Sequence, residues 1–288
     1  MKIFIDTADL EEIKEAASWG ILDGVTTNPS LIKKAVEKMK SKGKEISMED
    51  YIKEICKAVN GPVSLEVKGR NCEEMVREAK ILHEKFNGIN NNVVVKIPIN
   101  TAYNLNESQF EGIKAIKELE SIGIKTNATL VMTPEQALMA AKANASYVSP
   151  FLGRVDDFIR KNLGIRHGKM DYWDFEAIKL IEYESRKKNA YGGYEEVSRI
   201  EYNDRGIYSG VDLTRSIIKI YRTYNFRTKI IAASIRNARQ VRQVAELGVD
   251  IATIPFIVIK EMICHYKTME GIKRFSEDVV EEYENIFK

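Results

Sequence analysis

The sequence is poor in cysteine and histidine, with three of each in 288 residues. The cysteines lie too far apart for a zinc-binding pair, and an odd number argues against a complete disulfide framework. The histidines are not spaced as metal ligands either. These residues are Cys56, Cys72, Cys264, His83, His167 and His265. We therefore expect no metal site and a reducing cytoplasm, and we predict no other cofactor.

The sequence also lacks an excess of charge and a long hydrophobic run. Lysine and arginine number 44 against 42 aspartates and glutamates, so no global field favours nucleic acid or an anionic membrane. The first residues become acidic at Asp6 and Asp9, before any hydrophobic region of signal-peptide length. We expect no nucleic-acid binding, no membrane association and no export. The hydrophobic fraction of 44% is ordinary for a globular protein.

Eight short apolar, β-branched runs recur along the chain. They are KIFID from Lys2, GVTTN from Gly24, VSLEV from Val63, VVVKIP from Val93, KTNATLV from Lys125, YVSPF from Tyr147, KIIAAS from Lys229 and IATIP from Ile251. Continuous apolar character is typical of parallel strands covered by helices. Each run precedes a stretch with helical character.

Two of these stretches show the helical period clearly. One follows the third strand, with Asn71 as the expected N-cap, and the other follows the sixth. Their apolar residues are Met75, Val76, Ala79, Leu82 and Phe86 in the first, and Leu213, Ile217, Tyr221 and Tyr224 in the second.

Strict alternation of strand and helix predicts an α/β fold, a (β/α)₈ TIM barrel formed by residues 1–288 as a single domain. A doubly wound open sheet is the alternative. Against it, no GxGxxG follows the first strand, where IDTADLEE would repel a pyrophosphate.

A charged and aromatic segment from about Arg160 to Arg205 interrupts this alternation. We interpret it as an insertion after strand six, with a short helix near Ile178–Ile181 and a turn at Gly192–Gly193. Two alternatives stay open. The segment packs its aromatic residues on the barrel rim, or it serves as a lid or an oligomer contact.

Polar residues occur at the carboxyl ends of the predicted strands, where TIM barrels carry catalytic groups. They are Asp6, Asn28, Glu66, Lys96, Asn127, Thr129, Ser149 and Ser234. Lys96 is the most informative, because three valines that should be buried precede it. Burial favours the free amine, which can attack a carbonyl to form an imine. The alternatives are a lysine that snorkels from the strand end or one that is ion-paired with Glu66 or Asp6.

Three of the other residues have competing interpretations. Glu66 has apolar neighbours, which favour protonation and suit a general acid or base. Asp6, considered alone, is better explained as the N-cap of the helix that begins near Leu10. Asn28 precedes a proline and could bind a substrate hydroxyl, although capping of the helix from Pro29 is favoured.

Two arginines, Arg154 and Arg236, are predicted in the loops after strands six and seven. Barrels commonly bind phosphate near their last loops, so Ser234 and Arg236 could form part of a phosphate clamp. Each arginine considered alone is better explained as solvated or ion-paired.

Eight ordered motifs make the sequence resemble the transaldolase family, in particular its short form related to the fructose-6-phosphate aldolases. The motifs are FIDTADL, GVTTNPSLI, VSLEV, VVVKIP, KTNATL, YVSPFLGRVDD, AASIRN and DIATIPF. The resemblance covers nearly the whole chain outside the insertion.

The resemblance implies a role for each candidate residue. Lys96 would be the Schiff-base lysine, Glu66 an acid and base acting through a water held by Thr129, and Asp6 the group that handles the proton of C–C cleavage. Ligands for the dihydroxyacetone hydroxyls would be Asn28, Asn127 and Ser149, and the phosphate site would consist of Arg154, Ser234 and Arg236.

The implied reaction is a ping-pong transfer in the pentose phosphate pathway. Lys96 would cleave fructose 6-phosphate, release glyceraldehyde 3-phosphate and pass the dihydroxyacetone unit to erythrose 4-phosphate, which yields sedoheptulose 7-phosphate. The alternative is an aldolase that releases free dihydroxyacetone. Glu66 and Phe151 favour transfer, because the aldolase-type members tend toward glutamine and tyrosine at these positions.

A third interpretation is a catalytically silent barrel that acts in binding or assembly. The number of polar residues at the strand ends disfavours it. We also expect a homo-oligomer, although the insertion departs from the short family pattern and leaves the ring-shaped decamer of that family open.

Overall fold

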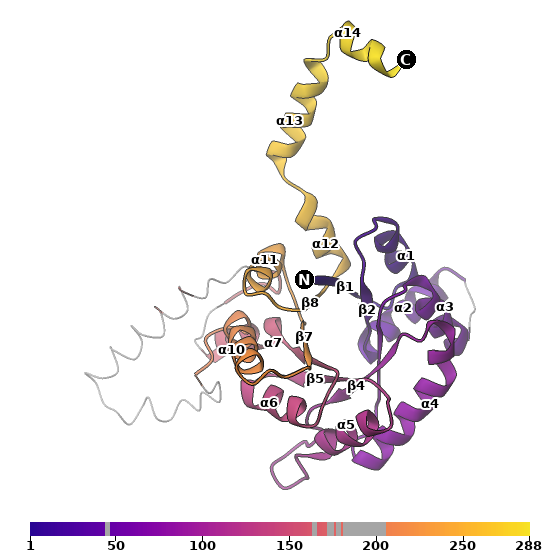
Figure 1. The fold of residues 1–288 in the computed structure, drawn as a ribbon, viewed down its shortest axis with the longest axis vertical. Helices are drawn as coiled ribbons and strands as arrows, with labels where there is room; N and C mark the ends of the chain where they lie inside the picture. The colour runs from indigo at the N-terminus through magenta and orange to yellow at the C-terminus, as the bar shows by residue number, and fades with distance from the viewer. Residues whose placement is uncertain (44–46, 163–165, 172–175, 177–179, 181–205) are drawn as a thin grey trace.

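The chain folds as a closed barrel of parallel strands surrounded by helices (Figure 1). The computed structural model describes residues 1–43, 47–162, 166–171, 176, 180 and 206–288. Within these residues the strands pair in sequence order and β1 closes the barrel against β8. The predicted (β/α)₈ barrel is confirmed.

The eight predicted strands all form. They are β1 (Lys2–Asp6), β2 (Gly24–Thr26), β3 (Val63–Glu66), β4 (Val93–Pro98), β5 (Thr126–Val131), β6 (Tyr147–Pro150), β7 (Lys229–Ala232) and β8 (Ile251–Ile254). The helices are α1 (Leu10–Ser18), α2 (Pro29–Ser41), α3 (Met48–Ala58), α4 (Cys72–Asn90), α5 (Glu111–Ser121), α6 (Pro134–Lys142), α7 (Leu152–Asn162), α10 (Gly210–Thr223), α11 (Ala238–Glu246), α12 (Phe256–Ile263), α13 (Tyr266–Glu277) and α14 (Glu281–Glu284).

The strands divide their side chains between two apolar clusters of unequal size. The larger cluster contains Val93, Val95 and Ile97 of β4 and the equivalent residues of the other strands, together with the inner faces of the helices. The smaller cluster consists of Phe4, Ile231 and Ile251, with Tyr147 packed against it. Its residues share a strand face with Asp6, Ser149 and Thr253, because side chains alternate along a strand. The barrel interior is therefore apolar at one end and polar at the other.

The two helices with a clear period form as predicted, apart from one residue. Asn71 caps α4, and its side chain accepts a 2.8 Å hydrogen bond from the amide of Glu74. In α10 the residues Leu213, Ile217 and Tyr221 are buried, but Tyr224 is 68% exposed. Tyr224 was predicted as part of the helical repeat but falls just outside it, because the helix ends at Thr223 and the chain reverses at Asn225, whose φ is 52°.

Most of the predicted insertion lies outside the described residues, including the helix near residues 178–181 and the turn at Gly192–Gly193. Its first part, residues 166–171, is described and contains a turn from Gly168 to Asp171. The amide of Gly168 donates to Asp171 Oδ2 at 2.5 Å, and the amide of Asp171 donates to the Gly168 carbonyl at 3.1 Å.

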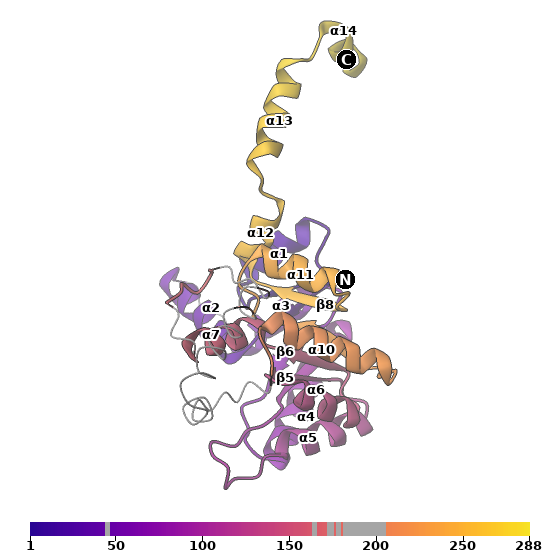
Figure 2. The same ribbon diagram turned by 90° about the vertical axis from the view of Figure 1, so that its left-hand side faces the viewer.

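The chain after the last barrel helix extends away from the ring of helices. Figures 1 and 2 show α13 and α14 projecting beyond α12. No residue of α13 or α14 is buried. No helix in the described ranges has both the length and the apolar character needed to cross a membrane.

Two glycines within helices predict opposite effects of the same substitution. A Cβ at Gly112 in α5 would lie 2.0 Å from the carbonyl oxygen of Pro98, whereas a Cβ at exposed Gly88 in α4 would meet nothing within 4 Å. We expect Gly112→Ala to lower the free energy of unfolding by about 1–3 kcal/mol through overpacking. Gly88→Ala should raise it by roughly 0.5–1 kcal/mol because alanine is the better helix former. Urea unfolding of both variants measures the difference, and equal effects would contradict the packing argument.

Candidate active site

A cavity of about 230 Å³ opens at the carboxyl ends of the strands. Its lining residues are Asp6, Thr26, Asn28, Lys96, Ser149, Phe151, Arg154, Lys169, Ala233, Ser234, Arg236 and Thr253. Eight of the eleven residues predicted from sequence are among them. The other three lie on the two strands that pair with β4, which carries Lys96: Glu66 on β3, and Asn127 and Thr129 on β5.

Lys96 is held in the cavity wall by two oxygen atoms. The residue is only 4% exposed, and its Nζ lies 3.0 Å from Glu66 Oε2 and donates a 2.9 Å hydrogen bond to the carbonyl of Thr27. Glu66 occupies the register position beside Lys96 on the neighbouring strand, so the strand pairing itself brings the two together. The predicted ion pair with Glu66 is present. An amine has three hydrogen-bonding directions, and Lys96 also lines the cavity.

Asp6 faces the same cavity from the end of β1. Burial raises the pKa of its carboxyl above the ordinary value of 3.8, against the opposing effects of Lys96 and of a hydrogen bond from Thr26. Thr26 Oγ1 donates to Asp6 Oδ1 at 2.9 Å. The capping interpretation of Asp6 was wrong: α1 is capped by Asp9, which stands directly before the helix and accepts from the amide of Glu11.

Three polar side chains from β5 and β6 lie on the other side of Lys96. Ser149 Oγ donates to Asn127 Oδ1 at 2.8 Å, and Asn127 takes the register position beside Lys96. Thr129 is fully buried, and its Oγ1 has no hydrogen-bond partner among the described residues. A buried hydroxyl without a partner costs free energy and is rare in native proteins. Thr129 is thus a position where a further polar group would be stabilised.

Asn28 combines the two roles that the sequence left as alternatives. Its Oδ1 accepts a 3.0 Å hydrogen bond from the amide of Leu31 and so caps α2. The side chain also lines the cavity. Because the cap uses only the oxygen, the amide nitrogen of Asn28 remains as a donor toward a ligand.

The predicted phosphate residues lie together at the end of the cavity formed by β6 and β7. Arg236 Nη2 lies 2.9 Å from Asp157 Oδ2, so this arginine is ion-paired. Its Nε is buried without a partner in the part of the chain that the structure describes. A Cβ at residue 153 would lie 2.2 Å from that Nε, so only glycine leaves room for the guanidinium. The guanidinium carbon of Arg154 lies 5.1 Å from the ring centre of Phe151.

A second buried carboxylate supports this end of the cavity from behind. Asp156 accepts from the amide of Gly210 at 2.8 Å and from Gln240 Nε2 at 2.6 Å, and Gln240 Oε1 accepts from the amide of Arg236 at 2.8 Å. Burial raises the pKa of Asp156 to about 6. Asp156 therefore links α7 to the first residues of α10 and α11 and to the loop of Arg236.

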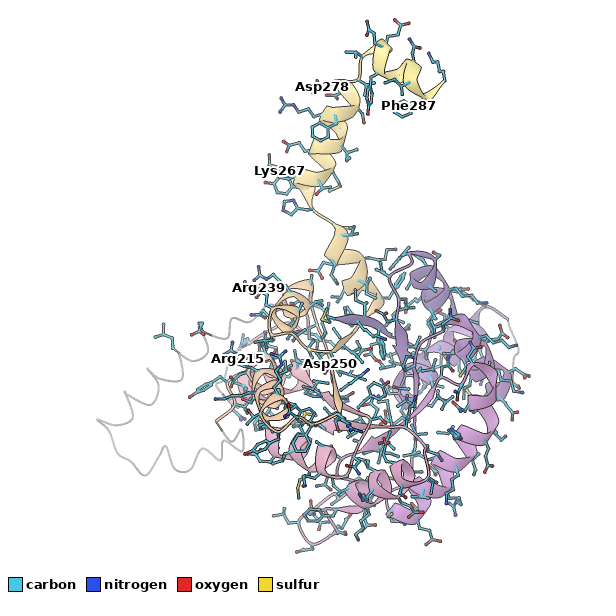
Figure 3. All side chains as sticks on the ribbon, viewed as in Figure 1. Arg215, Arg239, Asp250, Lys267, Asp278 and Phe287 are labelled. Atoms are coloured by element: carbon cyan, nitrogen blue, oxygen red, sulfur yellow. The ribbon has the colours of Figure 1, made fainter. Side chains whose placement is uncertain are left out.

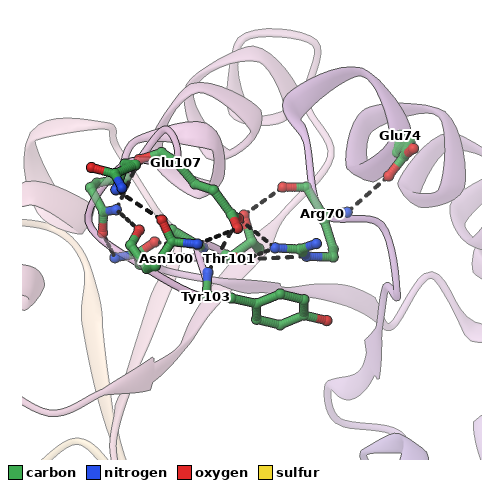
Figure 4. Close-up of polar contacts among 10 residues, drawn as sticks. Arg70, Glu74, Asn100, Thr101, Tyr103 and Glu107 are labelled. Carbon is green, nitrogen blue, oxygen red and sulfur yellow. Dashed lines mark hydrogen bonds and ion pairs between the residues drawn. The ribbon is translucent and has the colours of Figure 1, made fainter.

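The loops that follow β3 and β4 are joined by a polar network around Arg70 (Figure 4). Arg70 Nη2 lies 2.5 Å from Glu107 Oε2 and donates to the Thr101 carbonyl at 3.2 Å, while its guanidinium lies 3.4 Å from the centre of the Tyr103 ring. These contacts connect the loops directly after the strands that carry Glu66 and Lys96.

Four cavity residues were not among the predicted site residues: Thr26, Lys169, Thr253 and the apolar Ala233. Thr26 and Thr253, on the two strands that flank β1, share a 2.5 Å hydrogen bond, and the alternation of side chains along β2 and β8 could have identified them as inward-facing. Lys169 belongs to the insertion, and nothing in its sequence neighbourhood distinguishes it from other charged residues there. No cluster of three or more metal-ligating side chains is present among the residues with described positions.

A buried lysine beside a carboxylate, at the carboxyl end of a barrel strand, is typical of (β/α)₈ enzymes that act on carbonyl compounds. The profile of a family described as Transaldolase/Fructose-6-phosphate aldolase matches residues 3–287. The chain therefore belongs to this family of enzymes.

Curated relatives agree with the family match. The chain is 39% identical over 278 residues to a probable transaldolase of Kosmotoga olearia. This match covers 96% of this chain and 95% of the relative. It is 40% identical to probable transaldolases of Prosthecochloris aestuarii, over 281 residues, and of Chlorobaculum parvum, over 278 residues. Each of these matches covers 96% of this chain and 97% of the relative.

The raised pKa of Asp6 predicts that this residue lowers stability at neutral pH. A carboxyl whose pKa is higher in the folded than in the unfolded state stabilises the fold when protonated, and this contribution is lost as pH rises through the folded pKa. We expect Asp6→Asn to raise the melting temperature at pH 7, with a gain that shrinks toward pH 4. Thermal unfolding at both pH values measures this, and a lower melting temperature at pH 7 would contradict it.

Proposed function

We propose that this chain is a transaldolase that moves a dihydroxyacetone unit between sugar phosphates through a Schiff base on Lys96. The observation that carries the proposal is the position of the Lys96 amine, which is buried beside Glu66 and borders the cavity. The family and the names of its curated relatives support the same reaction class.

The first steps form the imine. Lys96 Nζ adds to the C2 carbonyl of fructose 6-phosphate, and the resulting carbinolamine loses water to give a protonated imine. Each step moves a proton between nitrogen and oxygen. Glu66 carries these protons through a water on Thr129, a role supported by its 3.0 Å contact with Lys96 and by the unpaired hydroxyl of Thr129.

Asp6 then starts the cleavage. It accepts the proton of the C4 hydroxyl, the C3–C4 bond breaks, and the electron pair moves to the imine nitrogen to give an enamine, so glyceraldehyde 3-phosphate is released. A carboxyl with a raised pKa is suited to accept this proton and to return it. The enamine attacks the aldehyde of erythrose 4-phosphate, Asp6 returns the proton, and hydrolysis of the new imine releases sedoheptulose 7-phosphate. The protonated imine is the electron sink.

The remaining site residues bind the substrate. Asn28, Asn127 and Ser149 are placed around Lys96 for the hydroxyls of the dihydroxyacetone unit. Arg154, Ser234 and Arg236 bind the phosphate at the far end of the cavity, where charge-assisted hydrogen bonds are strongest for guanidinium groups.

Transfer is favoured over release of free dihydroxyacetone by Phe151. Its ring lines the cavity beneath Arg154 and offers no group that could orient a water or donate a proton to the enamine. An aldolase that releases dihydroxyacetone is the second candidate, because the matched family includes both activities.

We further place the protein, as a single-domain enzyme of the pentose phosphate pathway, in the cytoplasm. The three cysteines are free, which fits a reducing compartment.

A homo-oligomer is supported by the projecting C-terminal arm, residues 264–288. In Figure 3 the side chains of Lys267, Asp278 and Phe287 lie away from the barrel. Four apolar residues of α13 recur every third position and are at least 63% exposed: Tyr266, Met269, Ile272 and Phe275. An apolar stripe on a projecting helix is typical of an association surface, and we propose that it packs against a second copy of this chain.

The Schiff base predicts acceptor-dependent turnover that requires one lysine. With fructose 6-phosphate, release of glyceraldehyde 3-phosphate in a coupled assay should depend strongly on added erythrose 4-phosphate. Lys96→Met should abolish it, while Lys125→Met, an exposed lysine at the other end of the barrel, should leave it unchanged. Borohydride reduction in the presence of fructose 6-phosphate should modify Lys96, as read by peptide mass spectrometry.

The outcomes separate the candidates. Equal release without acceptor would reassign the chain as an aldolase. Absence of turnover together with absence of trapping on Lys96 would disprove both enzymatic functions.

The arm predicts an association that charge on α13 disrupts. Ile272→Glu combined with Phe275→Glu should reduce the molar mass measured by light scattering after gel filtration. The matched control is Lys267→Glu with Arg274→Glu, two positions on the polar side of the same helix. A monomeric wild-type chain, or a double apolar variant of unchanged mass, would contradict the proposed contact.

A further inference from the structure

We propose that Lys169, in the first part of the insertion, is a third cation of the phosphate subsite and binds the phosphate of the sugar substrate directly. The inference rests on the proposed function, because it concerns the ligand of the same cavity. It assigns a binding residue to a segment that lies outside the eight motifs shared with the family.

The position of Lys169 carries the inference. It lines the cavity together with Arg154, Ser234 and Arg236. The turn that presents it is tied to both flanking helices: Arg160 Nη2 of α7 donates to the Asp171 carbonyl at 2.8 Å, and Asn237 Nδ2, at the start of α11, donates to the Met170 carbonyl at 3.4 Å.

Gly168 lies close to the carboxylate that closes this turn. A Cβ at Gly168 would lie 2.9 Å from Asp171 Oδ1, so a larger residue would displace the carboxylate that accepts the Gly168 amide. The lysine is therefore presented by a short turn with its own hydrogen bonds, attached to the elements that carry the two arginines.

The charges at this end of the cavity balance a phosphate only when Lys169 is included. Asp157 neutralises Arg236 through the 2.9 Å ion pair, whereas Arg154 and Lys169 have no ion-pair partner within the described ranges. A phosphate monoester carries about −1.5 to −2 charges at pH 7. Arg154 alone would leave roughly one of these charges uncompensated, and Lys169 supplies the second free cation.

Arg236 and Lys169 would contact the phosphate in different ways. Arginine offers a fixed fork for bidentate contacts, while lysine contributes a flexible point charge. Arg236, enclosed by Gly153 and Asp157, defines one phosphate position. The exposed Lys169 can follow phosphates of substrates that differ in length, and both the donor and the acceptor of a transaldolase carry one.

The test compares Lys169→Met with Lys161→Met, an exposed lysine of α7 that does not line the cavity. We expect the KM for fructose 6-phosphate to rise roughly 5- to 30-fold in Lys169→Met, as for loss of one charged hydrogen bond, with kcat nearly unchanged. Activity on unphosphorylated fructose should not change. Lys169→Arg should retain the KM within about threefold, because the cation is kept.

Titration with inorganic phosphate, followed by calorimetry, tests the inference independently of turnover. Wild type and Lys161→Met should bind phosphate equally, and Lys169→Met about tenfold more weakly. If sugar phosphates are not turned over but this ranking holds, the proposed function fails and the anion site stands. If phosphate binds equally to Lys169→Met and wild type, or does not bind to wild type, the inference is wrong whatever the activity.

Discussion

The structure depends on keeping a charged lysine and a carboxylate inside a closed barrel. Removing both ions from water costs several kcal/mol each, and their attraction offsets this only when their remaining hydrogen-bonding positions are satisfied. Strand register places Glu66 beside Lys96, and the carbonyl of Thr27, directly after β2, accepts a second hydrogen bond from the amine. A shift of β4 by one residue would turn Lys96 outward into the apolar layer beneath the helices.

The division of the barrel into two apolar clusters allows the fold to be stable with a polar interior. The large cluster between strands and helices buries most of the apolar side chains, whereas the inner cluster contains only Phe4, Ile231 and Ile251 with Tyr147. The inner layer above them consists of hydroxyls, amides and carboxylates, which add little hydrophobic stabilisation. Folding free energy thus comes mainly from the outer layer, and the interior is available for chemistry.

The charged residues at the phosphate end of the cavity lie in loops and at helix starts, whereas Lys96, Glu66 and Asp6 lie on strands. Asp156 links three helices there, and its carboxylate reaches the Arg236 amide through Gln240. Asp157, the next residue, pairs with the guanidinium of Arg236. Adjacent acidic residues thus orient the backbone and the side chain of one arginine.

The sequence by itself determined the eight strands, the barrel and the region of the site. Continuous apolar runs and helical periods indicate burial directly. The carboxyl ends of all strands in a parallel barrel lie at the same end of the barrel, so polar residues at these positions are brought near one another. Side-chain partners were decided only by the tertiary structure. Asp6 and Asp9 are three residues apart, yet Asp9 caps α1, whereas Asp6 ends β1 and faces the cavity with a raised pKa.

Lys169 is a cavity residue that the sequence patterns could not identify. In the sequence it is one charged residue among many in an irregular insertion, and no period marks it. Only the contacts of its turn with α7 and α11 bring it to the cavity, because they join residues far apart in the chain. Local patterns determine which residues are buried, whereas the partner of a charge is set by long-range packing.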